Sequence, residues 1–274
     1  MSFQLLPAVA RRLEGKVAVI TGGARGIGEH TARLFLKHGA KVVIADIEDD
    51  LGHALCNDYL GSSSSSFVHC DVTKEKDVEN AIDTAVSKYG KLDIMFNNAG
   101  VFDEASNFDI LKDDPLTFQK VVNVNLVGAF LGTKHAARVM KPCGRGSIVT
   151  TASICSVIGG IGTHAYTSSK HGVLGLMRNT AVDLGRYGIR VNCVSPNVVP
   201  TEMGRKLFKL KEGDEFPSFY WNLKGGDILR EEDVGEAVVY LGSDESKCVS
   251  GLNLIVDGGF TVVNQALCSF QPSH

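Results

Sequence analysis

Short apolar runs rich in β-branched residues alternate with longer amphipathic segments along nearly all of the 274 residues. Unbroken apolar runs are typical of strands buried on both faces, and apolar residues three or four apart are typical of helices packed on a sheet. Strands that alternate with helices build a parallel sheet covered on both sides. We therefore predict an α/β fold, a single domain with a seven-stranded, doubly wound parallel sheet. The strand-like runs are KVAVIT, KVVIAD, SFVHCD, LDIMFN, GSIVTT, IRVNCVS and LNLIVD, and the helical segments are Glu29–His38, Lys74–Tyr89, Leu116–Met140, Tyr166–Tyr187 and Glu231–Ser243.

Two long segments interrupt this alternation, Phe102–Asp114 after the fourth run and Pro196–Gly226 after the sixth. In open α/β sheets, ligands bind beyond the carboxyl ends of the strands, so both segments are candidate walls of a substrate site. We expect the second segment to form a substrate cap loop at about residues 197–226. The expected domain spans residues 15–264, between an N-terminal arm at residues 1–14 and a C-terminal tail at residues 265–274.

The composition excludes several classes of function. A net charge of −3 without a basic block lacks the electrostatic footprint of a protein that binds nucleic acid or an anionic membrane surface. No apolar run reaches transmembrane length, and the opening MSFQLLPAVARRLEG is too short and interrupted for a secretory signal, although its two arginines leave a transit peptide open. The seven cysteines are scattered without a CxxC or Cys/His cluster, which indicates reduced thiols in the cytoplasm rather than disulfides or a metal site. We expect a cytoplasmic protein with a small-molecule ligand.

Three glycines, Gly22, Gly26 and Gly28, follow the first apolar run directly and precede a helix. Glycine permits a tight turn and lets backbone N–H groups approach a pyrophosphate at the positive end of a helix. The spacing GxxxGxG differs from the GxGxxG of the standard dinucleotide fingerprint. Its position after the first strand nevertheless predicts the dinucleotide loop of a Rossmann fold.

Two charged residues bear on the choice of dinucleotide. Asp46 ends the second strand, 18 residues after Gly28, where an acid accepts hydrogen bonds from the adenosine ribose and repels a 2′-phosphate. Asp46 therefore favours NAD. Arg25 lies between the glycines and could meet a 2′-phosphate, face solvent, or pair with an acid such as Asp46 itself.

Seven pieces of the sequence, in order and spacing, resemble the short-chain dehydrogenase/reductase family over essentially the whole chain. The resemblance implies a seven-stranded doubly wound fold, a dehydrogenase or reductase with a nicotinamide cofactor, and assembly as a homotetramer. The pieces are TGGARGIG at Thr21–Gly28, Asp46, the Asp71-Val72 pair, NNAG at Asn97–Gly100, Asn125, Ser153 and YTSSK at Tyr166–Lys170.

Tyr166 and Lys170 are four residues apart, so on a helix they share one face. A neighbouring ammonium group stabilises phenolate, so we expect Lys170 to lower the pKa of Tyr166 toward that of a working base. The resemblance implies that Tyr166 takes the proton of a substrate hydroxyl and that Lys170 also holds the nicotinamide ribose. It further implies that Ser153 orients the substrate oxygen and Asn125 supports a water relay. Each residue alone has a plainer structural explanation, but together with the glycine loop they favour catalysis; His164 is expected only to start the helix or pack.

The resemblance extends to the ligand contacts. In PNVVPT, Asn197 replaces the family's usual glycine, and Asn tolerates positive φ better than most residues, so the turn survives with an added polar side chain near the nicotinamide. The implied cofactor-binding residues are Gly22, Arg25, Gly26, Ile27, Gly28, Asp46, Ile47, Asp71, Val72, Asn98, Ala99, Gly100, Tyr166, Lys170, Pro196, Val199 and Thr201. The implied substrate-binding residues are Ser153, Cys155, Tyr166, Asn197, Met203, Leu207 and Phe208.

The cap loop is rich in apolar and aromatic residues, including Phe216, Phe219, Tyr220 and Trp221, and its lysines are few, which favours an apolar alcohol or ketone. The segments KVVIAD, FVHCDVT, GKLDIMFNNAG, GTKHAARVM, GIRVNCVSP and DESKCVSGLNLIVDGG resemble the plant group of secoisolariciresinol, xanthoxin and borneol dehydrogenases and momilactone A synthase. That group implies NAD-dependent oxidation of a secondary alcohol on a terpenoid or lignan skeleton, with a monoterpenol such as borneol first. An NADPH-dependent ketone reductase and a non-redox dinucleotide-binding scaffold remain the alternatives.

Overall fold

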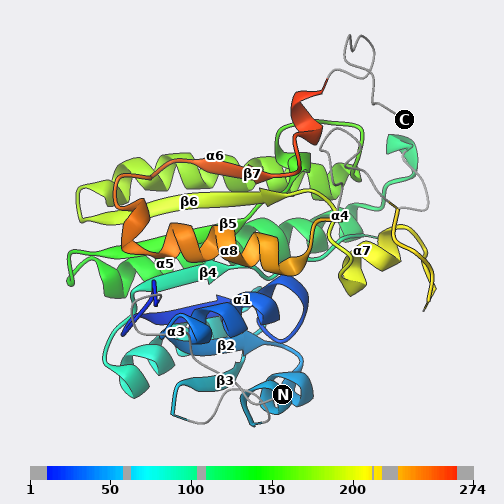
Figure 1. Ribbon diagram of the computed structural model, residues 1–274. Coiled ribbons are helices and arrows are strands. Elements are labelled where there is room, and N and C mark those ends of the chain that lie inside the picture. The colour runs from blue at the N-terminus through cyan, green and yellow to red at the C-terminus, as the bar shows by residue number, and fades with distance from the viewer. Residues whose placement is uncertain (1–10, 58–62, 104–108, 212, 218–227, 264–274) are drawn as a thin grey trace.

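Seven parallel strands form one sheet in the order β3-β2-β1-β4-β5-β6-β7 (Figure 1). The computed structural model describes residues 11–57, 63–103, 109–211, 213–217 and 228–263. Consecutive strands run outward in both directions from β1 and β4, so the chain order reverses between these two neighbours. The strands are β1 (Val17–Thr21), β2 (Lys41–Asp46), β3 (Ser65–His69), β4 (Ile94–Asn97), β5 (Gly146–Thr151), β6 (Ile189–Pro196) and β7 (Asn253–Val256).

Helices cover both faces of the sheet (Figure 1). Because side chains alternate along a strand, β1 sends Val17 and Val19 to one face and Ala18 and Ile20 to the other. The first pair packs with α3, α5 and α6, and the second pair packs with α1 and α8. The helices are α1 (Gly26–Lys37), α2 (Asp49–Leu55), α3 (Glu75–Tyr89), α4 (Pro115–Val122), α5 (Gly128–Met140), α6 (His164–Gly185), α7 (Glu202–Leu207) and α8 (Glu231–Gly242).

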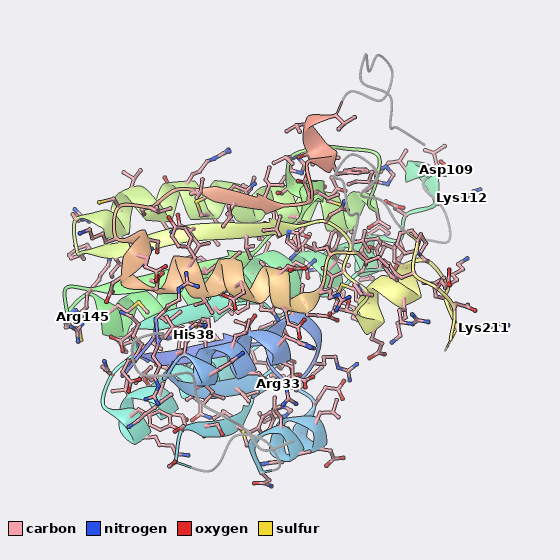
Figure 2. The ribbon with its side chains drawn as sticks, viewed as in Figure 1. Arg33, His38, Asp109, Lys112, Arg145 and Lys211 are labelled. Carbon is pink, nitrogen blue, oxygen red and sulfur yellow. The ribbon has the colours of Figure 1, made fainter. Side chains whose placement is uncertain are left out.

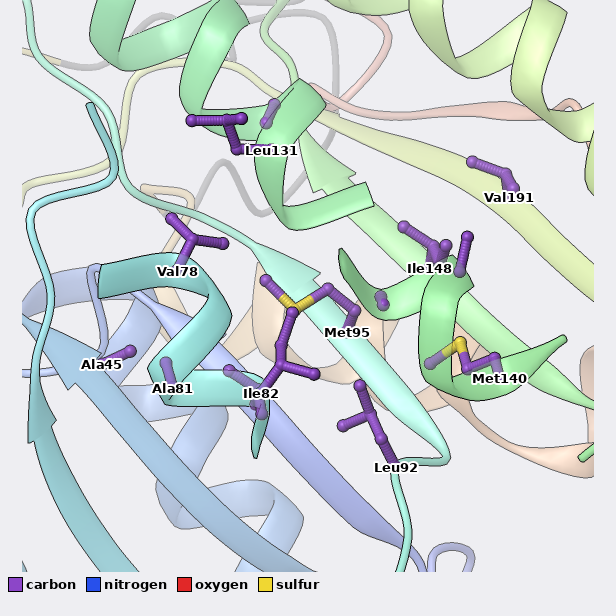
Figure 3. Close-up of a cluster of buried hydrophobic side chains, with 14 of the residues drawn as sticks. Ala45, Val78, Ala81, Ile82, Leu92, Met95, Leu131, Met140, Ile148 and Val191 are labelled. Carbon is purple, nitrogen blue, oxygen red and sulfur yellow. The ribbon is translucent and has the colours of Figure 1, made fainter. Parts of the chain in front are cut away.

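Figure 3 shows the core beneath α3 and α5, where Ile82 of α3 and Met140 of α5 flank Met95 of β4. All three side chains are fully buried. Burying a side chain of this size stabilises the fold by about 1.5–3 kcal/mol. Strands buried on both faces therefore form a rigid sheet. The loops at its ends are less constrained by packing.

The long segments predicted to wall a site lie at one end of the sheet. In Figure 2, Asp109 and Lys112 of the segment after β4 lie at the same end as Lys211 of the segment after β6, whereas Arg145, which precedes β5, lies at the opposite end. Carboxyl ends of parallel strands meet at one edge, and ligand sites of open α/β sheets lie there.

The structure confirms the predicted α/β fold and its seven parallel strands. It differs in the helices, because the continuous segment predicted at Leu116–Met140 contains a π-helical turn at Asn123–Val127 between α4 and α5. The short helices α2 and α7 were not predicted. Most of the predicted arm, the tail at residues 265–274 and part of the cap loop lie outside the described residues. Among the described helices, none combines the length and apolar character needed to span a membrane.

Candidate active site

The turn between β1 and α1 forms an open cradle of backbone. Gly22 and Gly26 have φ angles of 62° and 53°, which glycine adopts without steric cost. A Cβ atom on Gly28 would lie 2.0 Å from the carbonyl oxygen of Gly22, so the approach of these two backbones requires glycine. The N-cap residue Arg25 places no side-chain bond on the first turn of α1. Backbone N–H groups at this helix N-terminus therefore remain available, as a pyrophosphate requires, and the cradle fits a dinucleotide.

The ends of β1 and β4 are tied together beside this cradle. Thr21 Oγ1 accepts hydrogen bonds from the backbone N–H groups of Asn98 at 3.1 Å and Ala99 at 3.3 Å. Asn98 Nδ2 donates to the Gly22 carbonyl oxygen at 3.0 Å, and Asn98 Oδ1 accepts from Thr151 Oγ1 at 3.1 Å. The NNAG segment thus fixes the glycine turn on one side and the end of β5 on the other.

Asp46 ends β2 as a buried carboxylate held by backbone donors. Its Oδ2 accepts from the N–H of Ala24 at 2.9 Å and its Oδ1 from the N–H of Glu48 at 3.1 Å. The residue is only 7% exposed, whereas the neighbouring Ile47 is 60% exposed. The negative charge therefore lies directly beside the glycine turn, as predicted for a group that faces the adenosine ribose.

Arg25 does not pair with Asp46. Its guanidinium group binds Glu48 Oε1 at 2.7 Å and also contacts the carboxylate of Glu202, the first residue of α7. Of the alternatives left open, pairing with a nearby acid is the one the structure shows, although the acids are Glu48 and Glu202 and not Asp46. The acids that engage Arg25 come from the loop after β2 and from the cap, and both elements are brought to the glycine turn by the parallel topology.

Asp71 and Val72, the predicted adenine contacts, follow β3. Asp71 Oδ1 accepts from the backbone N–H of Thr73 at 3.0 Å, and this bonding together with Lys74 holds the pKa of Asp71 below its usual range despite the opposing effect of burial. Val72 is buried against Gly128, where an added Cβ would lie 2.8 Å from the valine Cγ2. Both residues shape the loop beside Asp46.

Ser153, Tyr166 and Lys170 converge beyond the end of β5. The Ser153 side chain lies close enough to the Tyr166 phenol to lower its pKa, and its Oγ accepts from the N–H of Cys155 at 3.2 Å. Lys170 Nζ lies 5.5 Å from the centroid of the Tyr166 ring and donates to the Thr151 carbonyl oxygen at 2.7 Å. The predicted base, its serine partner and the lysine thus occupy one small site.

The structure corrects the expected electrostatics of this set. Burial raises the pKa of Tyr166, the Cys155 thiol raises it further, and the hydrogen bond from Ser153 lowers it only in part. The Lys170 ammonium group, 5.5 Å from the ring centroid and bonded to the Thr151 carbonyl oxygen, does not offset the effect of burial. Burial lowers the pKa of Lys170 itself to about 8. Ionisation of Tyr166 in the free protein is therefore disfavoured by desolvation.

Asn125 lies inside the π-helical turn, a feature that often marks functional sites. Its Oδ1 accepts from the N–H of Val101 at 2.8 Å, and its Nδ2 donates to the Val101 carbonyl oxygen and to Ser169 Oγ. A Cβ on Gly100 would come within 3.4 Å of Asn125 Oδ1 and 3.6 Å of Lys170 Nζ. Asn125 and Lys170 are therefore neighbours across Gly100, and the amide braces the segment after β4.

A family model described as "Enoyl-(Acyl carrier protein) reductase", of the short-chain alcohol dehydrogenase type, matches residues 22–261. The chain belongs to the short-chain dehydrogenase/reductase family. It is 54% identical to secoisolariciresinol dehydrogenase of Forsythia intermedia, over 98% of this chain and 97% of that protein. It is 57% identical to the mitochondrial borneol dehydrogenase of Lavandula x intermedia, over 96% of each.

A solved structure of 3-ketoacyl-(acyl-carrier-protein) reductase from Brucella melitensis, complexed with NADH, superposes with a TM-score of 0.82. It is 32% identical in sequence and covers 91% of this chain and 99% of its own. The resemblance drawn from the sequence motifs is confirmed, including the plant group. As a short-chain dehydrogenase/reductase, the chain is an oxidoreductase that uses a nicotinamide dinucleotide.

Asn197 follows β6 of this short-chain dehydrogenase/reductase in an ordinary backbone conformation. Its φ angle is not positive, since Lys209 is the only non-glycine residue with positive φ in the described part of the chain. The turn therefore accommodates Asn197 without using the tolerance of Asn for positive φ. Its Oδ1 accepts from the N–H of Val198 at 2.8 Å, but its Nδ2 is buried and finds no hydrogen-bond partner among the residues that the structure describes. Leaving such a donor unpaired costs about 1–3 kcal/mol.

The cap begins with Pro196, Val199 and Thr201. Val199 is buried, and Thr201 Oγ1 accepts from the N–H of Gly204 at 3.2 Å as the N-cap of α7. The predicted substrate residues Met203 and Leu207 lie on α7, and the Phe208 ring packs edge-on against Phe216 at 5.6 Å. Phe219, Tyr220 and Trp221, which we expected nearby, lie outside the described residues.

Sequence reasoning did not find the partners of Arg25 or the neighbour of Tyr166. Glu48 and Glu202 are 154 residues apart in the chain. The only sequence signal for Glu48 is that it lies two residues after Asp46. The Phe102 ring packs on the Tyr166 ring at 4.7 Å. These ion pairs and ring contacts form because the ends of different strands lie close together in the fold. No local sequence pattern predicts them.

We predict that Gly28→Ala weakens dinucleotide binding at least about tenfold, because its Cβ would meet the Gly22 carbonyl oxygen and open the cradle. Gly175→Ala is the control, since a Cβ there meets nothing within 4 Å. Calorimetric titration with NADH measures both. Equal affinity of Gly28→Ala and the unaltered protein would contradict the cradle.

Proposed function

We propose that this protein oxidises a secondary alcohol on an apolar terpenoid or lignan skeleton to the ketone, reversibly, with NAD as acceptor. The observation that carries the proposal is the Ser153–Tyr166–Lys170 cluster beside the glycine cradle. The cradle and the cluster lie at the carboxyl ends of β1 and β5, which are separated in the sheet only by β4. A dinucleotide lying along that edge would bring its nicotinamide to Tyr166.

The proposed chemistry divides among the four residues. Tyr166, once ionised, takes the hydroxyl proton of the alcohol, and Ser153 holds the substrate oxygen by a hydrogen bond. Lys170 would bind the nicotinamide ribose in exchange for its hydrogen bond to the Thr151 carbonyl oxygen. Its positive charge then favours the phenolate form of Tyr166. Asn125 supports the path by which the proton leaves. A nicotinamide bound beside Tyr166 would supply the acceptor for the hydride of the carbinol carbon.

The remaining contacts are proposed on the family pattern and on their positions around the site. The adenosine side comprises Asp46, Ile47, Asp71 and Val72, and the pyrophosphate side comprises Gly22, Arg25, Gly26, Ile27 and Gly28. The nicotinamide side comprises Asn98, Ala99, Gly100, Tyr166, Lys170, Pro196, Val199 and Thr201. The substrate is proposed to contact Ser153, Cys155, Tyr166, Asn197, Met203, Leu207 and Phe208.

The substrate class rests on relatives and on the apolar cap. Two relatives that match over nearly the whole chain are named secoisolariciresinol dehydrogenase and borneol dehydrogenase. A monoterpenol such as borneol is our first choice, and a lignan or diterpenoid alcohol is the second. The unpaired Nδ2 of Asn197 offers a donor to an oxygen atom of the bound substrate.

NAD is proposed over NADP because of how the charges are placed. The buried carboxylate of Asp46 would repel a 2′-phosphate. Arg25 is already held between Glu48 and Glu202, which argues against the NADPH-dependent ketone reductase that this residue first suggested. A non-redox scaffold is disfavoured because all four catalytic side chains are present and clustered.

The domain is proposed to span residues 15–264, with the arm and tail outside it and the cap at about 197–226. We also propose a cytoplasmic location, supported by the six free cysteines among the described residues. The name of one relative specifies mitochondria.

We predict that Asp46→Ser reduces the preference for NAD over NADP at least about tenfold, because the repulsion of the 2′-phosphate is lost. The ratio of kcat/KM values for the two cofactors measures the change. Asp49→Ser, an exposed acid on α2 that pairs with His69, should leave that ratio unchanged. An unaltered protein that prefers NADP would overturn the NAD assignment.

We predict that Tyr166→Phe lowers alcohol oxidation at least about a hundredfold while NAD binding is retained, because only the proton acceptor is removed. The reduced nicotinamide formed from a panel of terpenoid and lignan alcohols is followed by absorbance. Tyr187→Phe, beyond the end of α6, is the matched control and should keep full turnover. Full activity of Tyr166→Phe would remove this residue from the mechanism.

We propose a homotetramer, supported by exposed apolar side chains near the start of α4 and around the start of α5. Leu116 is 75% and Phe130 is 46% exposed there, and Phe118 and Val127 are also exposed. Exposed patches of this kind typically mark protein interfaces.

Light scattering should give four times the chain mass, and Phe130→Glu should yield smaller species because it places charge in the patch. Leu51→Glu on α2, also exposed, should leave the mass unchanged. A monomeric unaltered protein would contradict the assembly.

A further inference from the structure

The segment after β4 contacts the ring of Tyr166 directly. The Phe102 ring lies 4.7 Å from the Tyr166 ring, centroid to centroid, with an interplanar angle of 49°. Such tilted aromatic pairs are attractive beyond the effect of the area they bury. Phe102 therefore restrains the orientation of the phenol ring and covers one of its faces with apolar surface.

The same segment bonds to the first turn of α6. Asp103 accepts a hydrogen bond from Thr163 Oγ1, and this hydroxyl oxygen accepts in turn from the backbone N–H of Tyr166 at 3.2 Å. Farther along, Asp113 Oδ2 lies 2.9 Å from His164 Nδ1. Asp103 and Asp113, ten residues apart, thus contact Thr163 and His164, which lie shortly before Tyr166.

The charges of these contacts suit their position. A helix N-terminus carries partial positive charge that neighbouring carboxylates stabilise. Helix α6 has no acidic residue in its own first turn. Asp103 and Asp113, which come from the segment after β4, supply that negative charge. The pairing with Asp113 explains why a histidine lies at the helix start.

We propose that Phe102, Asp103 and Asp113 form a clamp that positions Tyr166 for proton abstraction and shields its phenol from water. Asp103 and Asp113 bond to residues at the start of α6, and Phe102, next to Asp103, packs on the phenol ring. These are positioning residues, since they act through Tyr166. The proposal rests on the proposed function, in which Tyr166 is the base.

The groups that face Tyr166 define what the clamp controls. The Ser153 hydroxyl and the Cys155 thiol approach from the segment after β5, and the Lys170 ammonium group approaches from α6 itself. The ionisable groups at the helix start are Asp103, Asp113 and His164. Burial is the largest effect on the pKa of Tyr166 and raises it, so removal of the Phe102 ring should admit water and lower that pKa.

The first experiment is the pH profile of kcat for Phe102→Ala at saturating NAD. We expect a plateau kcat about tenfold lower, because the phenol is less well oriented, and a midpoint about one unit lower, because the phenol is better solvated. Phe102→Leu keeps an apolar side chain against the phenol but no aromatic ring. It should therefore restore the midpoint of the pH profile more fully than the plateau kcat. A purely structural role would lower NAD affinity and melting temperature together without moving the midpoint, and that result would overturn the clamp.

The second experiment separates the aspartates from the rest of the segment. Asp103→Asn and Asp113→Asn should each lower the plateau kcat and the midpoint in the same directions, with KM for NAD unchanged. Asp109→Asn is the comparison variant, because its carboxylate accepts from the backbone N–H of Leu111 and pairs with Lys112 inside the segment. If all three variants showed the same plateau kcat and the same midpoint, Asp103 and Asp113 would have no special role in positioning Tyr166.

A readout without turnover distinguishes failure of the clamp from failure of the proposed function. Ultraviolet difference absorbance, with Tyr166→Phe as the blank, follows ionisation of Tyr166 in the NAD-bound protein. A lower midpoint in Phe102→Ala supports the clamp even if every alcohol tested is inert, which would count only against the proposed function. An unchanged midpoint overturns the clamp even in an active enzyme.

Discussion

The hydrogen bonds that join the ends of β1 and β4 are the interaction on which the site depends. Thr21 Oγ1 accepts from two backbone N–H groups after β4, and Asn98 then bonds to Gly22 and to Thr151. These contacts lie where the order of the strands reverses, the point at which open α/β sheets bind ligands. Because one asparagine touches both the glycine cradle and the end of β5, the cofactor turn and the catalytic strand keep a fixed separation.

Burial governs the chemistry of the site more than charge pairing does. Lys170 is only 3% exposed, and its side-chain ammonium group bonds to a backbone carbonyl oxygen. Tyr166 is desolvated, which favours its neutral form. Ligand binding must therefore change the surroundings of both groups before the phenol becomes a base. A ribose hydroxyl that competes with the Thr151 carbonyl oxygen for Lys170 would bring positive charge to bear on the phenol.

The sequence could predict the features that depend on local pattern. Unbroken apolar runs predict the strands, and the glycines that must admit a close backbone approach predict the cradle. Asp46 and the Tyr166–Lys170 spacing were found in the same way. The ion pairs of Arg25, the packing of Phe102 on Tyr166 and the bond of Asp103 join residues 23 to 177 positions apart in the chain. They depend on which strand ends become neighbours, and the raised pKa of Tyr166 depends on burial that only the packed structure reveals.

A crystal structure of the protein with NAD bound tests the central claim most directly, namely that one edge of the sheet holds the cofactor from Asp46 to Tyr166. The account predicts ribose hydroxyls within hydrogen-bond distance of the Asp46 carboxylate, the pyrophosphate on the N–H groups at Gly26–Gly28, and the nicotinamide beside Tyr166 with its ribose on Lys170. A dinucleotide bound away from the glycine cradle, or a nicotinamide directed away from Tyr166, would contradict it.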